Sequence, residues 1–360
     1  MDTKAESWLF NLQVGICENC DWGFLVPEGK IPGKCPHCFR QPLSTIGENI
    51  AGLPNLRPAE LYLPFELADS KLSQVVKAFV DGIPFSPQDL SARNLLKRLE
   101  RLYLPVWLVD CRTRATWQAE VGFDYEVVSH QDHFMGGKWI SKQVNEVRIR
   151  WESRLGRLDR QNNNIQAAAL EEHHSIIKAL GQFAWQNVQS YKPEIINIEN
   201  IRLPNRSPED AWSDVEAAIQ TRSAEECCKA ASAGHIRGFT WQPEFLEPNW
   251  TLLLFPVLSS YYIDDTGSEI PVILHGQTGR IAGTRRASMK RAKSAALTFL
   301  LGSAGIFILS LLVTVLSATL PVLLALAVIG IAMALLLGLG SIIPVAAVWW
   351  FNRSQQPVRV

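Results

Sequence analysis

The sequence predicts an α+β protein with a four-cysteine metal module near its N-terminus and a two-helix transmembrane hairpin near its C-terminus. Three observations predict this class: two CxxC pairs, helix-start signals followed by apolar strand patterns, and a long uncharged apolar run. The predicted parts are a cysteine module at 1–41, a linker at 42–64, a cytoplasmic α+β domain at 65–293, two transmembrane helices within 294–352 and a cytoplasmic tail at 353–360.

The composition narrows the class of protein. The 35 basic and 35 acidic residues leave no net charge, so the whole chain does not attract a polyanion. Seven cysteines, four of them in CxxC pairs, indicate metal ligation in a reducing compartment and not a disulfide framework. The opening MDTKAESWLF lacks the apolar stretch of a cleavable signal peptide, so we expect a cytoplasmic N-terminus.

The cysteines have the spacing Cys17-x2-Cys20-x14-Cys35-x2-Cys38, which is typical of a zinc ribbon. Four thiolates suit Zn²⁺, and a closed shell of four leaves no position for a reactive water. We therefore predict one structural Zn²⁺, with iron or a chance pairing of cysteines as the alternatives. His37 lies between the last two cysteines, and we expect it to face solvent.

A nucleic-acid role for this module is not favoured by its charge. Residues 1–40 contain four bases and five acids, which is not the positive surface that phosphate contacts require. Trp22, Phe24 and Phe39 could stack on bases, but a small core or a protein-contact face explains them better.

The C-terminal part contains 57 residues, Ala295 to Phe351, without Asp, Glu, Lys, Arg or His. One span needs about 20 residues, so we predict helices at about 295–317 and 321–351 with a turn over 317–321. Basic residues flank the run at Arg285, Arg286, Lys290, Arg291, Lys293, Arg353 and Arg359. The positive-inside rule then places both chain ends in the cytoplasm, with the helices in the inner membrane.

Neither predicted span contains an ionisable residue, which argues against an ion path. Gly330, Ala334 and Gly338 repeat every fourth residue in the second span. This small-residue stripe is expected to pack on the first helix, and assembly of subunits is the alternative.

The middle of the chain shows one pattern twice. Ser86, Pro87 and Asp89 signal a helix start, and a strand, a turn and a strand follow in YLPVWLVDCRTRATWQAEVGFDY. Ser207, Pro208 and Asp210 repeat the signal, followed by LLFPVLSSYYIDDTGSEIPVILHGQTG. This predicts an antiparallel domain of two related halves, unless the likeness is chance. Between them we expect a strand and turn in EVRIRWESRLGRLDRQ and a helix in IQAAALEEHHSIIKALGQFAWQNV.

Other reactive side chains do not form a recognisable catalytic set, so we predict that the protein is not an enzyme. His130 and His133 could hold a second metal, which the sequence leaves open; His173 and His174 are expected on a solvated helix face. Cys227 and Cys228 are expected to be packed. No Walker motif is present, and HGQTGRIAG is interpreted as turns.

Three segments resemble a bacterial family of zinc-ribbon membrane proteins. They are the four cysteines, the segment RLYLPVWLVDCRTRATW, and a third segment with matches at Pro256, Val257, Gly276, Gln277, Thr278, Gly279, Gly283, Arg286, Ser288 and Lys290. His275 stands where the family has Asn, and Phe255 before Pro256 is a second departure.

The resemblance implies a non-enzymatic adaptor or scaffold at the inner membrane. Members of this family are often labelled as relatives of a primosomal helicase or of transcription-factor ribbons, and they occur alongside SPFH-type and phage-shock-type membrane-stress proteins. A protein partner is therefore expected, and a homo-oligomer is left open. The alternative is a membrane-tethered nucleic-acid-binding protein that uses Arg148, Arg150, Arg154, Arg157 and Arg160, although acids alternate with these arginines.

Overall fold

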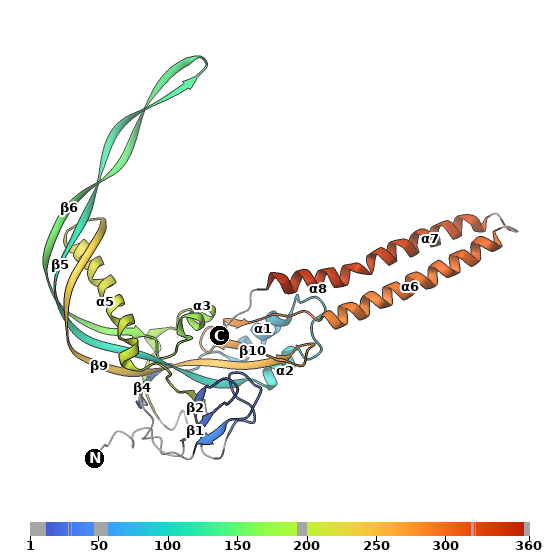
Figure 1. Ribbon diagram of the computed structural model, residues 1–360, viewed down its shortest axis with the longest axis horizontal. Helices are drawn as coiled ribbons and strands as arrows, with labels where there is room; N and C mark the ends of the chain where they lie inside the picture. Colours follow the sequence, from blue (N-terminus) through green and yellow to red (C-terminus); the bar gives the residue numbers. More distant parts are fainter. Residues whose placement is uncertain are drawn as a thin grey trace. The chain divides into compact units, whose positions relative to one another are not determined.

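The computed structural model is a mixed α+β protein that divides into two compact units (Figure 1). It describes residues 12–27, 29, 31–46, 57–192, 200–317, 320 and 322–355. Unit 1 comprises Met1–Pro105, Glu172–Leu203 and Leu254–Val360, and unit 2 comprises Val106–Glu171 and Pro204–Leu253. The predicted α+β class and the two apolar C-terminal helices are confirmed, but the sheet is not wholly antiparallel, because β5 and β8 pair in parallel.

The described strands form one large sheet in the order β11-β10-β9-β5-β8-β2-β1-β3, with β4, β6 and β7 paired beside this path. The strands are β1 (Leu12–Ile16), β2 (Gly23–Pro27), β3 (Ser44–Ile46), β4 (Ala59–Tyr62), β5 (Glu100–Met135), β6 (Lys138–Ala167), β7 (Gln189–Ser190), β8 (Asn200–Arg202), β9 (His235–Ile263), β10 (Glu269–His275) and β11 (Ile281–Gly283). The helices are α1 (Asp69–Val80), α2 (Ala92–Lys97), α3 (His173–Leu180), the 3₁₀ helix η3 (Trp185–Asn187), α5 (Pro208–Ala230), α6 (Met289–Leu316), α7 (Leu323–Gly340) and α8 (Ile342–Ser354).

The core of unit 1 is centred on Tyr262 in β9. Its ring is fully buried, and its hydroxyl donates to the carbonyl of Thr284 (2.8 Å) and accepts from the N–H of Arg286 (3.1 Å). The other buried members of this core are Val76, Phe79, Ile83, Leu90, Leu95, Leu258, Val272, Leu274, Ala287, Ala292 and Val348. The last three lie at the ends of the apolar helices, so these helices share one core with the sheet.

Hydrogen bonds also fasten the two helix ends to each other and to the sheet. The Asn352 side chain in α8 accepts from the N–H of Ala287 (2.8 Å) and donates to its carbonyl (3.0 Å). Ser288 caps α6 and donates to the carboxylate of Asp265, which also accepts from the N–H of Lys290. A carboxylate at a helix N-terminus accepts hydrogen bonds from free N–H groups and interacts favourably with the positive end of the helix dipole.

Two helical segments are long and apolar enough to cross a membrane: α6, and α7 continued by α8 over Leu323–Ser354. The first begins at Met289, before the predicted 295, and Ser317 follows its last turn. The other residues of the predicted turn, except Leu320, lie outside the described residues. Pro344 explains the break at Ser341, because proline cannot donate to the carbonyl four residues before it and clashes with that carbonyl.

The small-residue stripe of α7 packs on α6, as predicted. A Cβ on Gly330 would collide with the Ser310 hydroxyl oxygen and lie 3.2 Å from the Ser310 Cβ, so a larger residue here would force Ser310 to move. The Ser303 hydroxyl donates to the carbonyl of Ala334 (2.7 Å). Close backbone approach and interhelical hydrogen bonds are the means by which helices associate in lipid.

Unit 2 consists of parts of β5, β6 and β9 with helix α5 packed against β6. The helix start predicted at Ser207, Pro208 and Asp210 is confirmed, and it is a capping box, since the Ser207 and Asp210 side chains each bind the other's backbone N–H. Buried residues at Ala211, Val215, Ile219, Ser223 and Cys227 recur every fourth position and form one helix face. Trp212 adds an edge contact to Phe245 of β9, with ring centroids 5.0 Å apart.

The first predicted hairpin is wrong: the segment over 103–125 lies in the single 36-residue strand β5. The expected turn is absent, because buried and exposed side chains continue to alternate through residues 111–115. Thr113 is buried and its hydroxyl accepts from the Asn162 side chain of β6 (2.9 Å), whereas Arg112 and Arg114 are exposed. The pattern therefore does not occur twice in the same form, although β9 and β10 form the second hairpin as predicted.

Two helix predictions also need correction. Helix α2 begins after Ser91, not at Ser86, because Asp89 instead pairs with Arg98 (2.8 Å) and accepts from the N–H of Ile263 (2.8 Å). The helix predicted over 165–188 is limited to α3, and its first residues belong to β6.

The HGQTG segment forms a turn, as predicted, around the fully buried His275. Its Nδ1 accepts from the N–H of Gln277 (3.1 Å), and its Nε2 lies 3.2 Å from the carbonyl of Gln182, to which a neutral ring protonated at Nε2 donates. Phe183 stacks on the ring with centroids 3.8 Å apart. Burial lowers the pKa of His275 from its ordinary 6.5, with backbone hydrogen bonds acting in the opposite direction.

We predict that His275 makes the fold less stable in mild acid. Because its folded-state pKa is depressed, the unfolded chain binds the proton more readily, so this contribution is full above about pH 6.5 and is lost as the pH falls below it. His275→Asn keeps an acceptor but does not titrate. Thermal unfolding in detergent at about pH 7.5 and about pH 5.5 should show a drop in Tm that is a few degrees smaller for the variant; an equal drop would contradict the prediction.

Candidate metal centre

The four cysteines lie on two turns of the same shape. The N–H of Asp21 donates to the carbonyl of Cys17 (2.8 Å), and the N–H of Phe39 donates to the carbonyl of Cys35 (3.0 Å). Asp21 and Phe39 each have φ of 57°, the left-handed region that ends the turn. The two CxxC pairs therefore present their thiols in the same way from opposite sides.

The thiols meet at the spacing that a tetrahedral metal requires. The Sγ atoms of Cys17 and Cys38 are 3.6 Å apart, those of Cys20 and Cys35 are 3.7 Å apart, and all four lie within 4.8 Å of one another. Four sulfurs 2.3 Å from a central Zn²⁺ have edges of about 3.8 Å. The structure thus brings together the four predicted residues, as free thiols and in a geometry suited to one metal ion.

One thiol of the cluster loses its proton more readily than an ordinary cysteine, while burial raises the pKa of Cys17. The hydrogen bond with Cys20 lowers the pKa of Cys35 to about 5, and the N–H of His37 points at the Cys35 sulfur (3.4 Å). The same bond raises the pKa of Cys20, so the two thiols share a proton. A metal ion would displace this proton, because thiolates are the ligating form.

The aromatic residues of the module are core residues. Trp22, Phe24 and Phe39 are all buried, and Phe39 stacks on Tyr261 of β9 with ring centroids 4.6 Å apart. Their faces are therefore not available to nucleic-acid bases. The expectation for His37 was wrong: its ring is partly buried and stacks on Trp22 at 3.6 Å.

Arg202 of β8 is the charged neighbour that sequence reasoning missed. It is only 3% exposed, its guanidinium lies 4.3 Å from the Trp22 ring, and its Nη1 donates to the carbonyl of Gly23 (3.0 Å). Burial lowers its pKa to about 10, while Glu172, Cys20 and Cys35 act in the opposite direction. It therefore stays a cation at neutral pH.

A buried cation would offset the negative charge of the cluster once a metal is bound. Four thiolates around a divalent ion carry a net charge of about −2, which is costly in a desolvated setting unless it is compensated. Glu100 is an acid, so like the thiolates it adds negative charge when ionised. Burial, and then the charge of Cys35, raise its pKa to about 7. Arg202 is the buried positive charge beside the thiolates.

The module belongs to unit 1 and is joined to its sheet. Strand β2 pairs with β8 through Phe24 and Arg202, and Lys34 forms an ion pair with Glu269 of β10 (3.0 Å). Strands β3 and β4 occupy part of 42–64, where we expected an unstructured linker; residues 47–56 lie outside the described residues.

The other candidate ligands are not brought together. His130 and His133 lie three residues apart on β5, so their side chains point to opposite faces of the strand and cannot chelate one ion. Within the described ranges, the four cysteines are the one group of three or more Cys, His, Asp or Glu side chains close enough together to hold a metal. His173 and His174 begin α3 with their rings perpendicular, and Cys227 and Cys228 are buried in α5 as expected.

The arginines proposed for nucleic acid are largely paired with acids. Arg148 pairs with Glu146, Arg150 and Arg154 pair with Glu152, and Arg160 pairs with Glu226. These pairs cancel most of the positive charge that phosphate binding would use.

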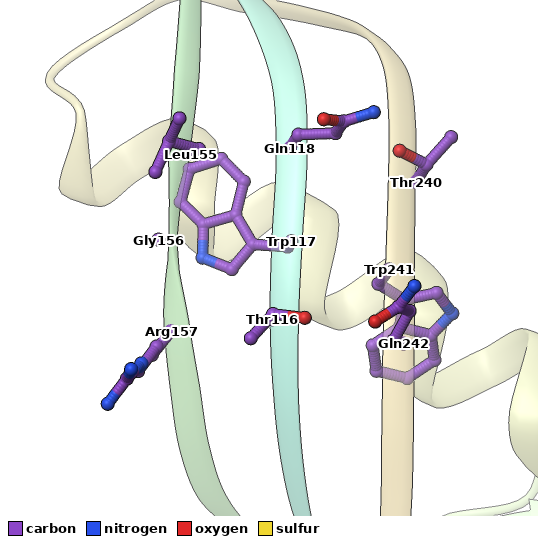
Figure 2. A pocket seen from close by; sticks show the side chains of 9 residues that line it. All are labelled: Thr116, Trp117, Gln118, Leu155, Gly156, Arg157, Thr240, Trp241 and Gln242. Atoms are coloured by element: carbon purple, nitrogen blue, oxygen red, sulfur yellow. The ribbon is translucent and has the colours of Figure 1, made fainter.

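Unit 2 contains a hollow of about 520 Å³ across β6, β5 and β9 (Figure 2). Its lining consists of Thr116, Trp117, Gln118, Leu155, Gly156, Arg157, Thr240, Trp241 and Gln242. These side chains offer hydroxyl, amide, indole and guanidinium groups but no acid, histidine or cysteine, so the lining has no acid–base pair.

No family model, curated protein or solved structure matches the chain. The resemblance described above therefore rests on its three motifs, and the chemistry of the metal centre rests on the geometry of its own residues.

We predict one metal ion per chain, bound by the four cysteines. Replacing Cys35 and Cys38 by serine should abolish binding, because two ligands cannot hold a structural ion. Cys227→Ser with Cys228→Ser is the matched control, since it also replaces two thiols by hydroxyls and should leave one ion bound. Elemental analysis of the purified full chain measures this, and metal retained by the first variant would contradict it.

We also predict that Arg202 tunes metal affinity. Arg202→Met should weaken binding about 10- to 100-fold, as loss of groups around a metal site typically does. Arg202→Lys should retain most of the affinity because it keeps the charge. Arg40→Met removes an exposed cation from the same module and should change affinity less than about 2-fold. Competition with a chromophoric chelator measures these affinities; equal effects of the two Met substitutions would refute the role of Arg202.

Proposed function

We propose that this protein is a non-enzymatic, membrane-anchored adaptor in which a structural zinc ribbon and the surrounding sheet hold a protein partner at the inner membrane. Both chain ends lie in the cytoplasm in this proposal, as the flanking basic residues favour. The SPFH-type and phage-shock-type proteins suggested by the family resemblance are the first candidate partners.

One observation carries the proposal: two adjacent tyrosines of β9 connect the cysteine module and the apolar helices. Tyr261 stacks on Phe39 of the module, and the cations of Lys34 and Arg98 each lie 4.7 Å from its ring centroid. Tyr262, on the opposite face of the strand, lies in the core that contains Ala287 and Val348.

This arrangement supports an adaptor because it fixes the module relative to the anchor. A partner bound to the module would be held near the membrane at a raised effective concentration without any chemical step. A flexible tether would allow the same recruitment but would not define its geometry.

The ligand set supports Zn²⁺ as the metal in this proposal. Four sulfurs at tetrahedral spacing favour Zn²⁺, and a closed set of four supports a structural role because no site for water or substrate remains. The buried cation of Arg202, whose pKa is lowered by burial and raised by the charges of Cys20 and Cys35, supports the same role.

The alternative, nucleic-acid binding by a membrane-tethered ribbon, is less well supported. The ribbon aromatics are buried, and most of the candidate arginines are paired with acids. Among the described residues of the ribbon, the large apolar side chain that stays on the surface is Ile31, which is 43% exposed. An exposed apolar residue beside a rigid metal site suits contact with a protein.

The test is cross-linked capture of full-length protein from native membranes. Ile31→Asp should remove a specific partner at least about ten-fold relative to wild type, since a charge would be buried in the contact. Leu155→Asp is the matched control, because it places the same charge at an exposed apolar position of unit 2. The metal content of both variants should equal that of the wild type.

Two outcomes would contradict the adaptor proposal. One is a set of captured proteins that is the same for wild type and Ile31→Asp. The other is salt-dependent binding of DNA or RNA by the full chain in fluorescence anisotropy, which would favour the nucleic-acid alternative.

A further inference from the structure

The end of the β5–β6 hairpin in unit 2 is a two-stranded ribbon with an apolar tip. Strand β9 begins at His235, which binds Asp124 of β5 (2.8 Å), and the hairpin continues beyond it (Figure 1). We define the hairpin tip as residues 134–140. Its large apolar side chains are Phe134, Met135, Trp139 and Ile140, which are 62%, 72%, 73% and 51% exposed.

The apolar surface surrounds the tip on both faces. Phe134 and Trp139 are cross-strand partners on one face, with ring centroids 5.3 Å apart. Met135 and Ile140 lie on the opposite face, because neighbouring positions of a strand alternate. A protein-docking site would need one apolar face, whereas a fluid lipid surface contacts all sides of an inserted tip.

The turn that joins β5 to β6 is tight, which keeps the hairpin tip narrow. Gly136 and Gly137 have φ of 61° and 79°, as required at the two central positions of a type I′ hairpin turn. The four apolar side chains are therefore held together at one end of a thin ribbon. Tryptophan is also the side chain that prefers the interface between lipid tails and water.

The charges beside the tip suit an anionic surface. Between Val127 and Asn145 the basic residues are Lys138 and Lys142, and the acidic residue is Asp132. Both lysines are exposed. Their long stems can lie along the apolar tip while the ammonium groups reach lipid phosphates.

We propose that the hairpin tip inserts into the interfacial region of a bilayer that contains anionic lipid. This is a membrane contact separate from the apolar helices. It is also independent of the adaptor proposal, because it involves neither the metal centre nor Ile31.

The test uses the full chain in cell membranes, with the photo-reactive residue p-benzoylphenylalanine in place of Trp139. Irradiation should give a phospholipid adduct by mass spectrometry. The matched control carries the same residue in place of Asn145, which is exposed on the same face of β6 and about 20 Å farther from the tip. The lipid adduct there should be at least about ten-fold weaker. A protein adduct at position 139, with a second copy or another protein, or equal lipid adducts at the two positions, would overturn the proposal.

A second comparison tests the lipid charge. With the probe at position 139, Lys138→Gln with Lys142→Gln should lower the adduct yield at least about five-fold in proteoliposomes containing phosphatidylglycerol, and little in pure phosphatidylcholine. Both changes are on exposed positions, so thermal unfolding should be unaltered. Equal yields with and without the lysines in phosphatidylglycerol would overturn the role of anionic lipid.

Discussion

The packing of Tyr262 into the core of unit 1 is the interaction on which the described architecture depends most. Its ring fills the space between the sheet, α1, α2 and the ends of the apolar helices, while its hydroxyl satisfies backbone groups at Thr284 and Arg286. These backbone groups precede α6, so the same side chain sets where the first apolar helix leaves the sheet. Burial of such a large ring stabilises a fold by about 1.5–3 kcal/mol, and the hydrogen bonds of the hydroxyl fix the orientation of the ring.

The metal centre depends on a balance of charge as much as on its ligands. Four converging thiols repel one another as thiolates, and Glu100 adds to the negative potential near Cys35. Arg202 opposes it from β8, held over the Trp22 ring and bonded to the carbonyl of Gly23. A buried cation without these partners would be destabilising, so the module and β8 stabilise each other.

The apolar residues of unit 2 are buried in one part and exposed in another. Near α5 they are buried in regular rows, whereas toward the end of the β5–β6 hairpin they are exposed on both faces. A two-stranded ribbon has little core of its own, so exposed aromatics at its end are more economically explained by an external apolar environment than by stability.

The sequence by itself determined the features that depend on local chemistry. The cysteine spacing identified the four thiols that come together. The start signal at Ser207 located α5, and the uncharged run located both apolar helices. Thiol spacing, helix capping and hydrocarbon thickness all act over short stretches of chain. The tertiary structure decided the rest. The polar segment after Cys111 became strand because Asn162, 49 residues away from Thr113, satisfies its buried hydroxyl. Asp89 does not take part in a helix start as expected, because its carboxylate binds the Arg98 side chain and the N–H of Ile263. Arg202 carries no local signal, since its role arises only when β8 pairs with β2 beside the thiols. Long-range partners of this kind depend on which strands become neighbours, which local patterns do not encode.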